Sequence, residues 1–168
     1  MAFFFSLSIE CGADQAAAAS CADHFGSWEL PPECALPNRT IRVSFQQESS
    51  GDPIWWAVVV PLGVSQSGVW SEDVAHEMSA AGVCLFDRLK TAPPFRFALI
   101  GVESQEAILR ANLDRHFAQD PTLADRYRGL VISQEIRDQL GASPVFGPFA
   151  PGYFWIPYRG ETFSKIPG

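Results

Sequence analysis

The sequence predicts an α+β domain with a ferredoxin-like βαββαβ order, in which helices cover one face of an antiparallel sheet. Four short segments predict strands: two alternate apolar and polar residues with a period of two, and two are largely apolar. They are residues 3–9, 41–47, 54–60 and 95–102. Two further segments, residues 15–25 and 72–90, carry capping residues and apolar residues at helical spacing.

The first half contains one strand, one helix and one hairpin. Residues 3–9 predict a half-buried strand, and Asp14 is placed to cap the helix at residues 15–25. Three prolines between Trp28 and Asn38 predict a loop. The turn-forming stretch at residues 49–53 then joins two strands into a hairpin. The second strand of this hairpin is apolar on both faces, so we expect it in the interior of the sheet.

The second half repeats the strand and helix signals. Ser71, followed by Glu72 and Asp73, is a strong helix start because acidic residues favour the positive end of the helix dipole. Gly82 weakens the middle of this segment, but we expect one helix that ends before Pro93. The strand at residues 95–102 follows, and a helix opening near Ser104 comes after it.

The chain is predicted to be one domain over residues 1–168, with a core at 1–118 and a C-terminal extension at 119–168. The extension contains signals for a short helix that ends near Arg128 and another from Ser133 to Gly141. Its last part is rich in Pro, Gly and aromatic residues. We expect an irregular aromatic arm with one short edge strand near residues 153–156.

Composition and charge exclude several classes of function. The net charge of −7 disfavours nucleic acid and anionic membranes as partners, because both require clustered Lys and Arg. An acidic surface suits a basic protein partner. The apolar N-terminal segment lacks the preceding basic residues of a secretory signal. We therefore expect a cytoplasmic protein.

The four cysteines do not have the spacing of a zinc ribbon or a disulfide framework. The sequence predicts that all four are reduced and mostly buried, since a domain of this size builds its own hydrophobic core. They are Cys11, Cys21, Cys34 and Cys84.

Candidate chemical motifs are incomplete. His76 and Glu77 begin a zinc-protease pattern, but the second histidine is missing. The stretch from Gly63 to Gly68 lacks both the lysine of a phosphate loop and the spacing of a nucleophile elbow. Cys84 is flanked by apolar residues, which favours burial over nucleophilic catalysis. We expect no catalytic residue, cofactor or metal site.

The strongest candidate for function is a partner-binding surface. Its acidic rim comprises Glu72, Asp73, Glu77, Asp87, Glu103 and Glu106. Its aromatic centre is expected to come from Trp55 or Trp56, which point to opposite sheet faces, and from the tail residues Tyr153 and Trp155. Carboxylates would attract a basic protein, and aromatic rings would anchor it.

These traits give the chain a resemblance in general character to the immunity proteins of bacterial polymorphic toxin systems. The resemblance rests on the order of elements, the carboxylates between Glu72 and Glu106, and the aromatic tail from Phe146 to Tyr158. It implies a non-enzymatic inhibitor that binds a toxin domain directly and blocks its active site. Two alternatives remain open: a small enzyme of the hydrolase or acyltransferase type, and a small-molecule binding or regulatory module.

Overall fold

The computed structural model describes residues 4–34, 36–47, 53–64, 66–102 and 127–163. Among these residues, seven strands form one sheet in the order β2-β3-β1-β4-β5-β7-β6, and every neighbouring pair is antiparallel. The strands are β1 (Phe5–Glu10), β2 (Ile41–Gln47), β3 (Trp55–Pro61), β4 (Phe97–Val102), β5 (Val131–Ser133), β6 (Gly147–Ala150) and β7 (Tyr153–Trp155). The helices are α1 (Gln15–Gly26), the 3-10 turn η1 (Pro32–Cys34), α2 (Glu72–Leu89) and α4 (Gln134–Gln139).

The four predicted strands and the first two predicted helices are present. The α+β class is therefore confirmed, but the sheet is larger than expected because β5, β7 and β6 extend it beyond β4. Helix α2 is continuous through Gly82, as predicted. The predicted helix that opens near Ser104, and most of the one that ends near Arg128, lie outside the described residues.

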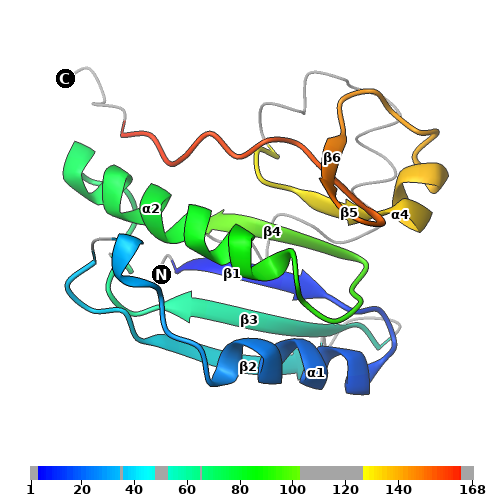
Figure 1. The fold of residues 1–168 in the computed structure, drawn as a ribbon, viewed down its shortest axis with the longest axis horizontal. Helices are drawn as coiled ribbons and strands as arrows, with labels where there is room; N and C mark the ends of the chain where they lie inside the picture. The colour runs from blue at the N-terminus through cyan, green and yellow to red at the C-terminus, as the bar shows by residue number, and fades with distance from the viewer. Residues whose placement is uncertain (1–3, 35, 48–52, 65, 103–126, 164–168) are drawn as a thin grey trace.

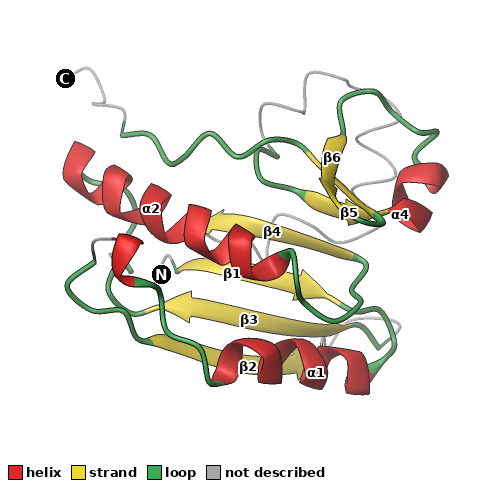
Figure 2. Ribbon diagram, in the orientation of Figure 1, coloured by secondary structure: helices red, strands yellow, loops and turns green. Residues whose placement is uncertain are grey.

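Helices α1 and α2 lie on the same face of the sheet (Figures 1 and 2). They bury one core together with the side chains of Leu7 and Ile9 from β1, Val59 from β3 and Ile100 from β4. A second core lies on the other face, where Ile136 of α4 packs with residues of β3, β4 and β5. The prediction of two helices on one face is thus confirmed for α1 and α2, while α4 covers the opposite face.

Strand β1 is buried on both faces, which corrects the expectation of a half-buried strand. It pairs with β3 on one side and β4 on the other. Its polar residues Ser6, Ser8 and Glu10 are all buried, and Glu10 is 0% exposed. The Oε1 atom of Glu10 accepts a hydrogen bond from the Gly12 N–H at 2.8 Å and lies 3.2 Å from Nη1 of Arg96. Alternation alone predicted a solvent-exposed face, but this face carries the second core, which includes Val58 and Leu99, the sheet partners of Ser8.

The aromatic extension is more regular than predicted. Strand β7 occupies the expected position, but it lies between β5 and β6 and is not an edge strand. Helix α4 begins after Ser133, whose side chain accepts from the Ile136 N–H as expected for a cap. Strands β5 and β6 were not predicted, because they contain only three and four residues.

After β7 the chain runs along α2 as a strap (residues 156–163, Figure 1). The Tyr158 ring packs on Phe86 and against Gly82, where an added Cβ would lie 2.7 Å from the ring. The Tyr158 hydroxyl donates to Glu161, whose N–H donates to the Ser79 hydroxyl oxygen at 2.8 Å. Burial raises the pKa of both the Tyr158 hydroxyl and the Glu161 carboxyl. The strap therefore occupies one side of α2.

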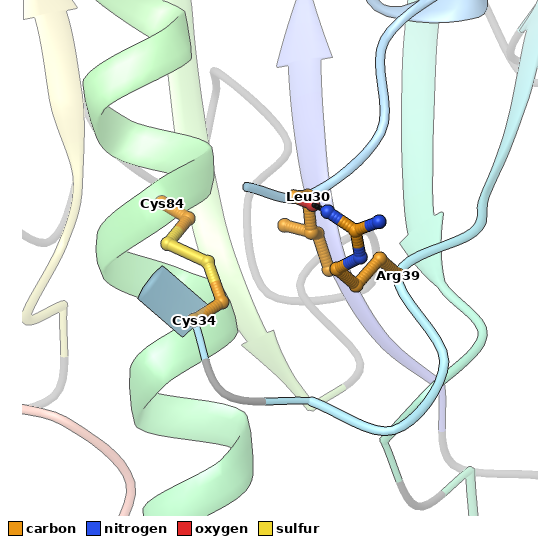
Figure 3. The surroundings of a disulfide bond; sticks show 4 residues. All are labelled: Leu30, Cys34, Arg39 and Cys84. Atoms are coloured by element: carbon orange, nitrogen blue, oxygen red, sulfur yellow. Dashed lines mark hydrogen bonds between the residues drawn. A yellow bond between two sulfur atoms is a disulfide. The ribbon is translucent and has the colours of Figure 1, made fainter. Parts of the chain in front are cut away.

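A disulfide joins Cys34 of η1 to Cys84 of α2, with their Cα atoms 6.6 Å apart (Figure 3). The prediction of four reduced cysteines is wrong for this pair and holds for Cys11 and Cys21, which are buried and free. Cys84 is half-buried on α2, where it lines the groove beside the proline-rich loop. Spacing in the sequence did not indicate this, because the two cysteines are 50 residues apart.

We expect Arg96→Leu to destabilise the fold by about 3–5 kcal/mol in urea unfolding, because it leaves the fully buried Glu10 carboxylate without its cation. Arg39→Leu, which removes an exposed partner 4.0 Å from Glu29, should cost less than about 1 kcal/mol. The double variant Glu10→Gln/Arg96→Leu should be more stable than Arg96→Leu alone. An equally small loss for both single arginine variants would contradict the structural role of the buried pair.

Removing the disulfide with Cys34→Ala/Cys84→Ala should lower the free energy of unfolding by roughly 2–4 kcal/mol, because the bridge restrains a long loop in the unfolded chain. Urea unfolding with and without a reductant provides the measurement. Reduced wild type should fall to the stability of the double variant, and the variant should not respond to the reductant. Four alkylatable thiols in unreduced wild type would show that the bridge does not form.

Candidate functional site

The principal groove lies between the proline-rich loop after α1 and the outer side of α2. Its volume is about 590 Å³, and its lining is mainly apolar. The lining residues are Trp28, Pro31, Glu33, Cys34, Ala80, Val83, Cys84, Asp87 and Arg88. The Cys34–Cys84 disulfide is part of this lining and fixes η1 against α2 (Figure 3). Because covalent and helical elements define both walls, the groove is present before any partner binds.

Trp28 forms one wall of the groove and is held from two sides. Its ring packs edge-on against Phe25 of α1, with the centroids 5.9 Å apart. The Arg88 guanidinium lies 5.9 Å from the Trp28 ring centroid, within the range of a cation–π contact. Arg88 also donates from Nη2 to the His24 carbonyl oxygen at 2.6 Å, and the His24 ring lies 3.1 Å from the Arg88 carbonyl. The position of the Trp28 ring is therefore set by contacts between the ends of two helices.

Helix α2 forms the other wall. Asp73, Glu77, Ala80, Cys84 and Asp87 are spaced by four, three, four and three residues, so they share one stripe of the helix. Ala80 and Cys84, in the middle of this stripe, line the groove, and the carboxylates lie at the two ends of the stripe. The stripe places negative charge on both sides of an apolar centre.

The surface of the groove is accessible. Val83 is 54% exposed, an unusual value for a valine in a helix that packs on a core. Glu33 and Asp87 are exposed at the rim. Asp87 makes an exposed ion pair with Lys90 at 2.7 Å, and such pairs contribute little to stability. A cation of a partner can therefore replace Lys90 beside Asp87 with little loss of folding stability.

The structure places the predicted acidic residues as follows. Glu72 and Asp73 are exposed in the first turn of α2, after the Ser71 cap, whose hydroxyl accepts from the Val74 N–H. Glu77 is half-buried, and Asp87 lies at the groove rim. The other two, Glu103 and Glu106, lie outside the described residues.

The predicted aromatic centre is not at the groove. Trp56 is only 4% exposed and packs edge-on against Phe97 in the second core, so it offers no surface to a partner. Trp55 is half-buried beside Phe45. The groove instead uses Trp28, to which the sequence analysis assigned only a loop position.

The two tail aromatics complete the fold. Tyr153 stacks on Phe95 at 4.3 Å, and its hydroxyl accepts from the Phe95 N–H at 3.0 Å and donates to the Phe95 carbonyl at 3.1 Å. Trp155 packs on Phe86 of α2.

One signal in the sequence could have located the groove: Val83 lies outside the apolar stripe of α2 that contains Met78 and Leu85. An apolar residue on the outer side of a helix indicates a surface contact.

A second, shallow depression lies at the start of α1. It is lined by Cys11, Gly12, Ala13, Asp14, Gln15, Ala16, Arg96 and Glu135. Two of its charged groups have structural roles: Asp14 caps α1 by accepting from the Ala17 N–H, and Arg96 pairs with Glu10. Within the described ranges, no group of three or more His, Cys, Asp or Glu side chains could hold a metal ion.

Two buried thiols lie beside this depression. The Cys11 S–H donates to the Cys21 sulfur, and the two sulfur atoms are 3.9 Å apart. This hydrogen bond raises the pKa of the Cys11 thiol, with a further contribution from burial, and lowers the pKa of the Cys21 thiol.

None of the helices that the structure describes is both long and apolar enough to cross a lipid bilayer. The comparisons with known proteins return no relative for this chain: no protein-family model matches it, and neither a curated protein nor a solved structure is significantly similar to it.

Proposed function

We propose that the chain is a non-enzymatic binding protein that docks a basic segment of a protein partner in the groove on α2. The observation that carries the proposal is an apolar centre at Trp28 and Val83 flanked by the carboxylates of Glu33, Glu77 and Asp87. Interfaces commonly have this arrangement, in which a buried apolar or aromatic centre supplies affinity and a charged rim supplies selectivity.

The charge of the chain supports a basic occupant. With a net charge of −7, the protein attracts cationic segments from a distance and repels acidic ones. At the groove itself, the best ligand is a segment with an apolar or aromatic side chain that contacts Trp28 and Val83. Flanking Lys or Arg side chains would then reach the carboxylates at the rim.

We further propose that the partner is a toxin domain that the chain inhibits stoichiometrically, as the immunity proteins that it resembles do. The support is an acidic domain with an accessible groove and no recognised catalytic motif. The enzyme and small-molecule alternatives make a different prediction, because in both the isolated protein would turn over or bind a small molecule.

The ferredoxin-like arrangement is also a proposal for residues 1–102. Its support is that β2-β3-β1-β4 are consecutive and antiparallel, with α1 and α2 on one face. The cytoplasmic location is likewise an expectation. The Cys34–Cys84 disulfide weighs against it, because disulfides persist mainly in oxidising compartments.

The docking proposal is tested by two variants that leave the core intact. Glu33→Lys/Glu77→Lys reverses the rim charge, and we expect it to slow association with a candidate toxin domain and to weaken its salt dependence. Val83→Arg places a cation in the apolar centre, and we expect a loss of about tenfold or more in affinity, mainly through faster dissociation. Surface plasmon resonance measures both rates, and growth rescue on co-expression measures inhibition.

Matched controls use residues away from the groove. Glu135→Lys changes a charge on α4, and Phe45→Arg places the same cation at an exposed apolar position of β2. Both should bind and protect as wild type does. Equal protection by the groove variants, at matched protein levels and with unchanged circular dichroism, would refute the assigned surface. Turnover of a substrate by purified wild type would favour the enzyme alternative.

A further inference from the structure

Cys11 and Cys21 are neighbouring free thiols that take no part in the Cys34–Cys84 disulfide. Cys11 follows the last residue of β1, and Cys21 lies on the buried side of α1. Their sulfur atoms are 3.9 Å apart, and a disulfide bond requires about 2.05 Å. Closing this gap takes a movement of less than about 2 Å, which side-chain rotation can supply.

The surroundings do not favour a metal site for this pair. Zinc sites of thiolate type use about four ligands, whereas around these sulfurs the described residues include no third His, Cys, Asp or Glu suited to share a metal ion. The Cys21 S–H donates to the Pro93 carbonyl oxygen, with the sulfur and oxygen atoms 3.7 Å apart. Two thiols in contact without further ligands are suited to disulfide chemistry.

Access to the pair is one-sided. Cys11 is 5% exposed and lines the depression at the start of α1, whereas Cys21 is 0% exposed. A small oxidant can therefore reach the Cys11 sulfur first. Cys21 lies behind it, in position to react with whatever Cys11 becomes.

We propose that Cys11 and Cys21 are a redox-active dithiol, which a small-molecule disulfide such as oxidised glutathione converts into a second intramolecular disulfide. This assignment goes beyond the docking function and does not depend on it. The Cys34–Cys84 bridge is then a constant structural link, and the Cys11–Cys21 bridge is the variable one.

The reaction balances as two thiol–disulfide exchanges. The Cys11 thiol loses its proton as its sulfur attacks one sulfur of the glutathione disulfide, the S–S bond of glutathione breaks, and the first glutathione leaves as a thiolate that takes up a proton. Cys21 then attacks the Cys11 sulfur in the mixed disulfide and expels the second glutathione. Two protein thiols are oxidised, one glutathione disulfide is reduced, and the two protons end on the two glutathione thiols.

The test is the titration of native wild-type protein with oxidised glutathione, followed by alkylation in urea and peptide mapping by mass spectrometry. We expect two alkylated cysteines per chain before oxidation and none after it. The oxidised map should contain a Cys11–Cys21 linkage beside an unchanged Cys34–Cys84 linkage. Because the map is read on wild type, the result does not depend on how any variant folds.

Two single variants test the order of events. Cys21→Ala should accumulate a glutathione adduct on Cys11, because no second thiol resolves it. Cys11→Ala should be modified at least about tenfold more slowly in the native state, because its remaining thiol is inaccessible, and should react freely in urea.

Three outcomes would overturn the proposal. The first is that both wild-type thiols survive excess oxidised glutathione in the folded state but react in urea. The second is linkage between separate chains, or exchange with Cys34 or Cys84. The third is equal rates of native modification for Cys11→Ala and Cys21→Ala. The first outcome would leave two inert core cysteines, and docking at the groove would be unaffected by it.

Discussion

The buried carboxylate of Glu10 is the constraint on which the arrangement of this domain depends. A fully buried charge must be compensated. The Glu10 carboxylate accepts a hydrogen bond from the Gly12 N–H in the turn before α1, and it forms an ion pair with the Arg96 guanidinium. The backbone of Arg96 completes the link, because its N–H donates to the Glu10 carbonyl and its own carbonyl accepts from the Ser133 N–H. The starts of α1, β4 and α4 are thereby fixed relative to the end of β1, and the depression that contains Cys11 is formed between them.

Helix α2 contacts three different parts of the protein on three sides. Its apolar stripe packs on the sheet, the side at Ser79 and Gly82 receives the C-terminal strap, and the remaining side faces the proline-rich loop. The strap and the disulfide hold segments on either side of the helix, so the exposed part of α2 is narrow. A partner that docks there meets a rigid wall, which reduces the entropy lost on binding.

Local patterns predicted the parts of the fold that depend on local physics. Alternation located β1 and β2, and largely apolar runs located β3 and β4. Capping residues located α1, α2 and α4, because Asp14, Ser71 and Ser133 act within one turn. What was missed depends on distant contacts. The ion pair of Glu10 and the partner of Cys34 involve residues at least 50 positions away in the chain. The interior place of β7 depends on its pairing with both β5 and β6.

The same distinction explains the candidate site. The carboxylates on α2 were recognisable in the sequence, since helical spacing alone aligns Asp73, Glu77 and Asp87. The aromatic centre was assigned to Trp55 and Trp56 because paired tryptophans in a strand are conspicuous, but the sheet buries Trp56. Trp28 reaches the groove only through the packing of Phe25 and Arg88, which no spacing reveals.

The register of β1, in which Leu7 lies between Val59 and Ile100, has a consequence for folding during synthesis. Strand β1 is translated before both of its neighbours, so the centre of the sheet closes only once β4 has been made.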